Sequence, residues 1–406
     1  MRSTFALLLL ACSACSTPPK GPPELRAKEL AHEFIILDGH IDVPERLYAQ
    51  KSSGKPVDDV GLRTEGGDFD HPRAVEGGLD APFMSIFTPA EDEEKGTSRQ
   101  VAEELIDLVE GIVRAHPDEF TLARTADEVR RAKKEHKLAL LLGMENGSPV
   151  EGKLENVEHF FERGVRYITL CHGKDNHICD SSYDERHTHK GLTPFGREVV
   201  QRMNELGILV DVSHISDDSF WQVMELTKAP AIASHSSLRH FVPGFERDMG
   251  DDMLRRLAEN GGVIQINFGS SFLTQPANQH FIEQRKAGQD YAAEHGLAED
   301  APELEAYMKE WSQAHPLPFA NVKDVADHID HAVEVAGIDH VGFGSDFDGV
   351  GDTLPTGLKD VSMYPNLIAE LLRRGHSEKD IEKICSGNVL RVMEACERVA
   401  RELGAR

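Results

Sequence analysis

The segment Leu138–Glu145, with the sequence LALLLGME, contains the pattern that decides the fold of this chain. A run of five apolar residues, 138–142, leads through a glycine and a methionine to a carboxylate. A short apolar run bounded by glycine or charge is typical of a strand that is buried on both faces. Further runs of this kind occur at 34–37, 83–87, 165–170, 208–212, 229–233, 262–268 and 340–343. The sequence therefore predicts a set of buried strands along the whole chain.

Stretches with helical spacing separate these runs. Val101, Leu105 and Ile112 lie on one face of a predicted helix. Thr193 followed by Pro194 is a typical helix start. Strand and helix alternating about eight times is typical of an α/β fold, the (β/α)8 TIM barrel. An open, doubly wound parallel sheet is the alternative, although no Gly-x-Gly-x-x-Gly or phosphate-loop motif favours it.

The predicted barrel forms one domain over residues 31–402. The connection 270–318 is too long for an ordinary strand-to-helix loop, and it has helical patterns of its own at 287–296 and 303–313. We therefore expect a helical insertion before the last strand, placed over one mouth of the barrel as a lid.

The composition argues against some classes of binding partner. The chain has 406 residues with 44 Lys and Arg against 70 Asp and Glu, a formal charge of −26, and 40% of its residues are hydrophobic. The apolar fraction is enough for a sizeable core. The negative charge argues against nucleic acid, because phosphates need Lys and Arg to replace their counterions. No apolar run approaches the roughly 20 residues of a membrane-spanning helix.

The first residues have the features of an export signal. Residues 1–15 contain a positive charge, a short apolar stretch and small residues. Cys15, or else Cys12, stands where a bacterial lipobox has the cysteine that receives a lipid. A plain signal peptide that contains cysteines is the alternative. With a Pro-rich tether at 16–30, we expect an exported protein, lipid-anchored in the periplasm or at the cell surface, with no other membrane contact.

Export would also affect the remaining cysteines, since it takes them out of a reducing cytosol. Cys171 and Cys179 are close in sequence, as are Cys385 and Cys396, so either pair could form a disulfide. Spacing alone does not fix the connectivity.

Six of the predicted strands end at, or within two residues of, a side chain suited to metal or proton chemistry. These are the histidines His40, His172, His214 and His235 and the carboxylates Asp42, Glu145 and Asp346. In a barrel the carboxyl ends of the strands meet at one mouth. Imidazoles and carboxylates bind Zn²⁺ while leaving positions for water, and two metals that share a carboxylate activate a water at neutral pH. The sequence therefore predicts a metal-dependent hydrolase.

The pair His187 and His189 has the same chemistry but a different setting. No apolar strand precedes it, so we expect a solvated loop rather than a further metal site.

Four longer motifs accompany these residues. They are DGHIDVP at 38–44, GLTPFGR at 191–197, GFGSDFDG at 342–349 and DVSMYP at 360–365. Together they resemble the membrane dipeptidase family of zinc peptidases, which includes renal dipeptidase and bacterial relatives. The resemblance runs from about residue 34 to 401, and the export signal suggests a bacterial lipoprotein member.

The resemblance implies two Zn²⁺ per subunit. His40 and Asp42 would bind the first zinc, and Glu145 would bridge both. His214 and His235 would bind the second. A hydroxide held between the two ions would attack the carbonyl of the peptide bond.

Roles in catalysis and substrate binding follow from the same resemblance. Asp346 would take a proton from the attacking water and pass it to the leaving amine, while His172 would hydrogen-bond the oxyanion. Arg247 would hold the C-terminal carboxylate of the substrate through two parallel hydrogen bonds. The alignment is looser there, and Arg239 is the competing residue.

The implied substrates are free dipeptides, including those with a C-terminal D-residue, and the implied assembly is a homodimer. This chain departs from the family at Asn146, where a glycine is usual, and around His172, so we expect a reshaped substrate wall. Two other classes stay open. One is an amidohydrolase-type enzyme for another amide, ester or lactam, and the other is a non-catalytic binding lipoprotein, which a lost metal ligand would indicate.

Overall fold

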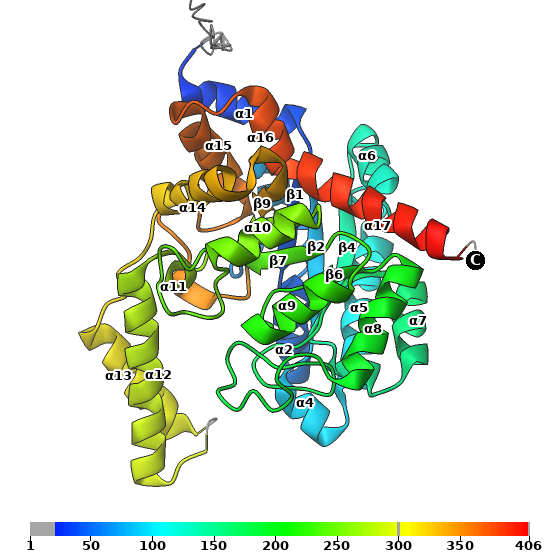
Figure 1. Cartoon of the computed structure of the whole chain (residues 1–406). Helices are drawn as coiled ribbons and strands as arrows, with labels where there is room; N and C mark the ends of the chain where they lie inside the picture. The colour runs from blue at the N-terminus through cyan, green and yellow to red at the C-terminus, as the bar shows by residue number, and fades with distance from the viewer. Residues whose placement is uncertain (1–20, 299–300, 405–406) are drawn as a thin grey trace, which may run out of the picture.

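A closed barrel of parallel strands forms the centre of the molecule (Figure 1). The computed structural model describes residues 21–298 and 301–404. Neighbouring strands pair in the order β2-β1-β9-β8-β7-β6-β5-β4, and β2 also pairs with β4, which closes the ring. The strands are β1 (Ile36–Ile41), β2 (Leu79–Phe87), β4 (Leu138–Glu145), β5 (Val165–Thr169), β6 (Leu209–Asp211), β7 (Ile232–Ser236), β8 (Val263–Ile266) and β9 (Val341–Phe343). The predicted TIM barrel is confirmed, and the open sheet is wrong.

Helices surround the strands (Figure 1). Those between the start of the chain and β5 are α1 (Pro23–Glu33), α2 (Val43–Ser52), α3 (His71–Gly77), α4 (Ala90–Lys95), α5 (Ser98–Ala115), α6 (Ala126–Lys134) and α7 (Leu154–Arg163). The next are α8 (Pro194–Leu206), α9 (Asp217–Leu226), α10 (Asp251–Glu259), α11 (Ser270–Leu273), α12 (Gln275–His295) and α13 (Pro302–Ala314). The last are α14 (Val322–Ala336), α15 (Tyr364–Arg373), α16 (Glu378–Glu382) and α17 (Asn388–Gly404).

Strand β4 shows how the sequence pattern positions the site. Ala139 and Leu141 belong to the apolar cluster inside the barrel, and Leu140 and Leu142 pack on the helix side. Since alternate residues of a strand share a face, the inward series continues through Gly143 to Glu145. The carboxylate therefore stands above the apolar interior, at the carboxyl end of the barrel. At the opposite end, residues of α17 belong to the interior cluster and close it.

A short strand, β3 (Phe120–Leu122), lies outside the barrel and pairs only with β4. This strand was not predicted, because three residues are too few to show the alternation of apolar and polar side chains that marks a strand.

The insertion between β8 and α14 is helical, as predicted. Helices α12 and α13 lie side by side, and the rings of Tyr291 and Tyr307 stack with centroids 4.0 Å apart between them. In Figure 1 the pair extends away from the barrel. Helix α12 begins at Gln275, well before the helical pattern recognised from residue 287, because Thr274 caps its first turn.

The start of the described chain corrects one prediction. Residues 23–30, expected as the end of a tether, belong to α1, whose Ala27 and Leu30 are buried. The helix packs against α15, and its Arg26 forms an ion pair with Glu378 at 2.7 Å. The amphipathic pattern of this segment outweighs its prolines, because Pro is tolerated in the first turn of a helix. The predicted signal at 1–15 and the lipid sites Cys12 and Cys15 lie outside the described residues.

Two further observations bear on the environment of the chain. None of the helices within 21–298 and 301–404 has the length and apolar character needed to cross a bilayer. The cysteines Cys171, Cys179, Cys385 and Cys396 are all buried and free, so neither candidate disulfide is formed.

Gly39 in β1 allows close packing across the barrel interior. A Cβ at this position would lie 1.5 Å from Gln265 Nε2 and 2.4 Å from the carbonyl oxygen of Ser234. We expect Gly39→Ala to lower the free energy of unfolding by about 1–3 kcal/mol, the usual cost of overpacking. Guanidinium unfolding would measure it, with Gly66→Ala as control, because a Cβ on Gly66 meets nothing within 4 Å. Equal midpoints for the two variants would contradict the packing account.

Candidate metal centre

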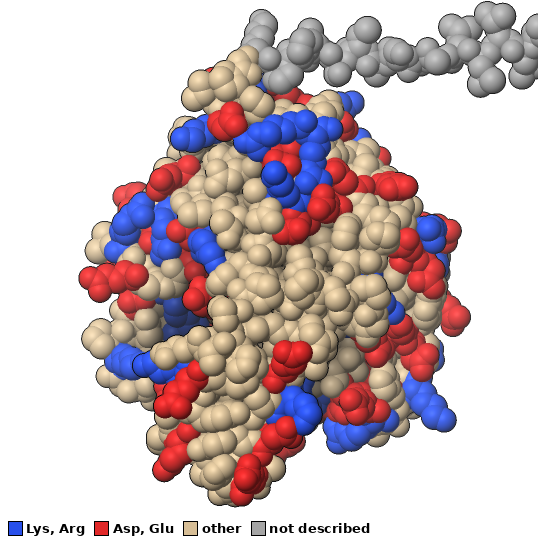
Figure 2. All heavy atoms as spheres, turned by 90° about the vertical axis from the view of Figure 1, so that its left-hand side faces the viewer, with Lys and Arg blue, Asp and Glu red and all other residues tan. Residues whose placement is uncertain are grey.

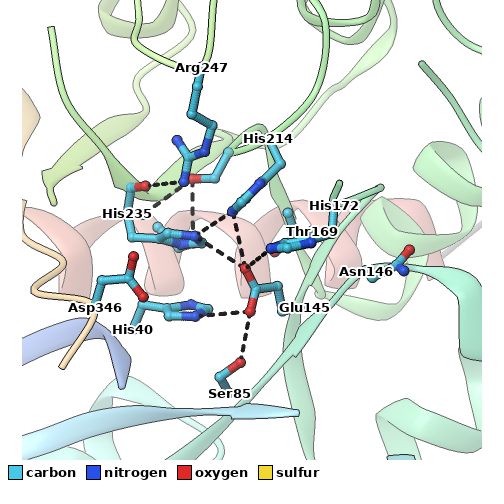
Figure 3. Close-up of polar contacts among 12 residues, drawn as sticks. His40, Ser85, Glu145, Asn146, Thr169, His172, His214, His235, Arg247 and Asp346 are labelled. Atoms are coloured by element: carbon cyan, nitrogen blue, oxygen red, sulfur yellow. Dashed lines mark hydrogen bonds and ion pairs between the residues drawn. The ribbon is translucent and has the colours of Figure 1, made fainter. Parts of the chain in front are cut away.

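Glu145, the last residue of β4, stands among four imidazoles at the barrel mouth, and those of His40, His214 and His235 are the nearest (Figure 3). Its Oε2 lies 3.2 Å from His40 Nε2. Its Oε1 lies 3.1 Å from His214 Nε2 and 3.3 Å from His235 Nε2. The side chains of Glu145 and these three histidines are buried, with no more than 6% exposed. Each oxygen of one carboxylate therefore faces a different set of nitrogen atoms.

The two sets have the separations expected of metal ligands. In the first, His40 Nε2 is also 3.2 Å from Asp42 Oδ2. In the second, His214 Nε2 and His235 Nε2 are 2.8 Å apart. Ligand atoms about 2.0–2.2 Å from one Zn²⁺ lie roughly 3.3 Å from one another in a tetrahedral site. The five residues predicted as metal ligands are thus brought together in two sets that share Glu145.

The hydrogen bonding at this centre also fits a cation. His40 Nε2 and Asp42 Oδ1 are buried and find no hydrogen-bond partner among the described residues. Leaving a buried polar atom unpaired costs about 1–3 kcal/mol. A divalent ion at the first set would give His40 Nε2 a partner, and nitrogen and carboxylate oxygen are donors that zinc accepts. The residues present therefore fit the metal that the predicted family implies.

Side chains behind the ligands hold the imidazole rings in place. His40 Nδ1 lies 2.7 Å from the Tyr167 hydroxyl. His235 Nδ1 lies 2.8 Å from Ser234 Oγ, which donates to Asp211 Oδ2 at 2.6 Å. Such outer partners fix the orientation of a metal-binding histidine. Neither Tyr167 nor Asp211 was predicted as a site residue. Each is a polar residue within an apolar strand, and this pattern could have marked it as a hydrogen-bond partner of the ligands.

Several residues at the mouth have left-handed backbone conformations. The φ angles are 70° at Asn146, 69° at His214 and 63° at Asp346. Non-glycine residues adopt this region at a cost of about 1–3 kcal/mol, and such strain clusters at functional sites. The chain therefore accepts a local cost to aim His214 and Asp346 inward just after their strands.

Asp346 lies beside the first ligand set. Its side chain forms a compact group with His40 and Asp42, and its Oδ2 accepts a hydrogen bond of 2.7 Å from Asn267 Nδ2. Burial, together with the charges of Asp42 and Glu145, raises the pKa of Asp346 well above its ordinary value. Asn267, just past β8, was not predicted, although it too interrupts an apolar run. One oxygen of Asp346 is thus fixed by Asn267, and the other lies toward the Asp42 carboxylate of the first ligand set.

His172 borders the second ligand set from the solvent side. Its Nε2 lies 3.6 Å from Glu145 Oε1, and 28% of the side chain is exposed. Its ring meets the edge of Phe87, with centroids 4.6 Å apart. Burial lowers the pKa of His172, which favours a neutral imidazole that can still donate one N–H.

The two candidate arginines have different surroundings. Arg239 forms two contacts of 2.7 Å with the carboxylate of Asp217 and also donates to the backbone of Glu246 and Asp248. Arg247 is buried beside the second ligand set, where it donates to the carbonyl oxygen of His235 at 2.6 Å. Its Nε has no partner in the described chain. Arg247 also donates to Ser236 Oγ at 2.7 Å, so protein groups hold both arginines, and Arg247 is the one that lies beside a metal-ligand candidate.

The His187 and His189 pair belongs to none of the candidate metal groups found in the described ranges. His189 Nε2 instead contacts the carbonyl oxygen of Asn176 at 3.0 Å. One group outside the centre does qualify by distance, formed by His240, Asp251 and His331. Its 2.9 Å contact from His331 to Asp251 joins α14 to α10.

A cavity of about 460 Å³ opens over the ligand sets. The floor contains Asp42, Glu145, His214 and Asp346. The walls come from several elements and include Glu45, Phe87, His172, Tyr183, Ser271, Phe272, Phe281, Arg285 and Val350. Residues 271 to 285 belong to the insertion, so the insertion forms part of the substrate space.

A parallel barrel whose carboxyl mouth holds imidazoles and carboxylates around one shared glutamate defines a class, the metal-dependent hydrolases. Comparison with known proteins gives the family. Residues 24–406 match the model of the membrane dipeptidase family, peptidase family M19. The chain belongs to this family, and the prediction of a membrane-dipeptidase-type metallopeptidase is confirmed.

Individual relatives agree with this assignment. Dipeptidase 3 of Mus musculus is 33% identical over 384 residues, covering 93% of this chain and 68% of the relative. Dipeptidase tcpJ of Claviceps purpurea is 35% identical over 373 residues, covering 89% and 77%. The crystal structure of the probable dipeptidase PvdM from Pseudomonas aeruginosa has a TM-score of 0.79 and 28% identity, covering 93% of this chain and 99% of that one.

Gly349 leaves the space in which two site carboxylates meet. A Cβ there would lie 2.2 Å from Asp42 Oδ2 and 2.3 Å from Asp346 Oδ1. We expect Gly349→Ala to weaken metal binding about 10- to 100-fold, as when the support of a ligand is removed. Zinc titration against a competing chelator would measure this, with Gly66→Ala as control. Unchanged affinity in Gly349→Ala would show that Asp42 has room to move.

Proposed function

We propose that this protein is a zinc-dependent dipeptidase that hydrolyses the peptide bond of free dipeptides, including those with a C-terminal D-residue. The observation that carries the proposal is the sharing of Glu145 between two sets of ligands in a chain of the membrane dipeptidase family. His40 and Asp42 would hold one zinc with Glu145, and His214 and His235 would hold the other. When bound, the two ions supply Lewis acidity and a water of lowered pKa.

Asp346 is placed to move the proton. Its Oδ2 is held by Asn267, and its Oδ1, on the side of Asp42 and the first ligand set, would accept a proton from the attacking water and give it to the leaving amine. The same residue can thus act as base and then as acid in one turnover.

His172 is placed to stabilise the oxyanion. A neutral imidazole keeps one N–H, and the His172 ring lies on the exposed side of Glu145, where a carbonyl oxygen would enter from the cavity. A fixed donor at a developing negative charge lowers the barrier without reorganising.

Arg247 would bind the terminal carboxylate of the dipeptide. A guanidinium held beside His235 would bind the terminal carboxylate close to the metal centre, and this would select short peptides by length. Since Arg239 is already paired with Asp217, Arg247 is the residue we assign to this contact.

A substrate panel combined with metal analysis tests the proposal. We expect about two zinc ions per subunit and hydrolysis of dipeptides, Gly-D-Ala among them, that stops when a chelator removes the metal. N-acyl amino acids and lactones in the same panel represent the wider amidohydrolase reactions. Turnover of these compounds without turnover of dipeptides would overturn the peptidase proposal, and metal binding without any turnover would indicate a binding protein.

Replacing Asp346 by Asn isolates the proton transfer. An amide of nearly the same shape cannot accept the proton, so we expect kcat on Gly-D-Ala to fall about 10²- to 10⁴-fold. The zinc content should stay close to that of the wild type. Asp127→Asn, on the exposed face of α6, is the matched control. Parental turnover in the Asp346 variant would remove the assigned role.

We further propose that the protein is exported and anchored by a lipid on Cys15 or Cys12, and that it forms a homodimer. Fatty-acid labelling of the wild type and of Cys15→Ala and Cys12→Ala would identify the acceptor, and label in both variants alike would exclude a single site. Sedimentation of the protein without its first residues would measure the assembly.

A further inference from the structure

Helix α12 of the insertion presents two residues to the substrate cavity. Phe281 and Arg285 both line it and are four residues apart, hence on the same face of the helix. Ser271 and Phe272 of α11 line the same wall. The insertion therefore adds an apolar surface and one guanidinium to the space above the metal centre.

Arg285 has no partner within the described ranges. Its guanidinium forms neither a hydrogen bond nor an ion pair there, and the residue is exposed. The next residue, Lys286, instead pairs with Asp290 one turn along, at 2.5 Å. An arginine that lines a cavity and is unpaired is available to an anionic ligand.

Tyr183 relates Arg285 to the rest of the site. This residue lines the cavity, and its ring centroid lies 5.9 Å from that of His214. Burial raises the pKa of Tyr183 to about 12, and the positive charges of Arg247 and Arg285 both act against this rise. Tyr183 and Arg285 thus line the same cavity as Glu145 and His214.

The charge of the protein and of its substrate gives Arg285 a possible role in substrate choice. The chain has a formal charge of −26, and Figure 2 shows acidic side chains interspersed with basic ones over the face that carries the insertion. Glu45 also lines the cavity, and burial together with the charge of Asp42 raises its pKa to about 8. A dipeptide with an acidic side chain carries a net negative charge near pH 7, so a cation that lines the cavity attracts it.

We propose that Arg285 forms an anion subsite that binds a second carboxylate of the substrate, so that this enzyme prefers dipeptides containing Asp or Glu. The inference rests on the proposed dipeptidase function. Arg247 takes the terminal carboxylate and Arg285 takes the side-chain carboxylate, which a planar guanidinium can bind through two hydrogen bonds. Phe281 packs beside the methylene groups of such a side chain.

Matched amides isolate the charge of the substrate. Ala-Asp is compared with Ala-Asn, and Asp-Ala with Asn-Ala, in both stereochemical forms of the C-terminal residue, with kcat/KM as the readout. We expect the wild type to prefer one acid over its amide. Arg285→Gln should reduce this acid-to-amide ratio about tenfold, and Arg285→Lys should reduce it less, since a hydrogen bond to a charged group contributes about that factor.

Lys286→Gln is the matched control, because it removes one positive charge from the same helix but not from the cavity. Its acid-to-amide ratio should equal that of the wild type. The wild-type preference should also weaken as NaCl is raised, since Arg285 is exposed and salt screens exposed charges.

The outcomes separate this inference from the proposed function. Hydrolysis of Ala-Asn and Asn-Ala, with an acid-to-amide ratio that Arg285→Gln leaves unchanged, would overturn the anion subsite and leave the dipeptidase intact. An equal fall of the ratio in Lys286→Gln would also overturn it, because the effect would then be the general field of the helix. No hydrolysis of any of these dipeptides by the zinc-loaded wild type would overturn the proposed function itself.

Discussion

The carboxylate of Glu145 is the constraint on which the site depends, because its two oxygens face two separate groups of buried nitrogen atoms. The Nε2 atoms of His214 and His235 lie 2.8 Å apart, and each is also within 3.3 Å of the Glu145 carboxylate. Strand β4 positions this carboxylate, because alternate residues of a strand share a face. Ala139 and Leu141 face the apolar interior, and Glu145 follows on the same face at the mouth. Stability and chemistry thus come from the same eight-residue segment.

The rest of the mouth shows what is required to hold such a group in place. Left-handed backbone at His214 and Asp346, a glycine at 349, and the contacts of the imidazoles with Tyr167 and Ser234 all restrict where ligand atoms can lie. Each of these features is costly or unusual alone, and together they leave the ligands little freedom before any ion arrives. Preorganisation of this kind lets a bound metal meet its ligands without moving them.

Much of this arrangement could be predicted from the sequence, and the exceptions have physical reasons. Apolar runs ending in His or a carboxylate indicated the strands and the ligands, because burial on both faces leaves a strong local signal. The hydrogen-bond partners Tyr167 and Asn267 left only an interruption in a strand, and β3 was too short for periodicity. Arg285 could not be placed at all, since its helix meets the cavity only through the tertiary fold. The predicted tether ran to residue 30, past the start of α1 at Pro23, because the prolines of this segment obscured the helical pattern in the sequence.

The position of α1 has a consequence for how the enzyme faces its surroundings. Its Glu24 pairs with Arg373 at the end of α15, and its Arg26 pairs with Glu378 at the start of α16. Helix α17, which follows, closes the end of the barrel opposite the mouth. Helix α1 therefore lies toward the end of the barrel opposite the candidate metal centre (Figure 1). A molecule held from that end would point its catalytic opening outward, toward diffusing peptides and away from its support.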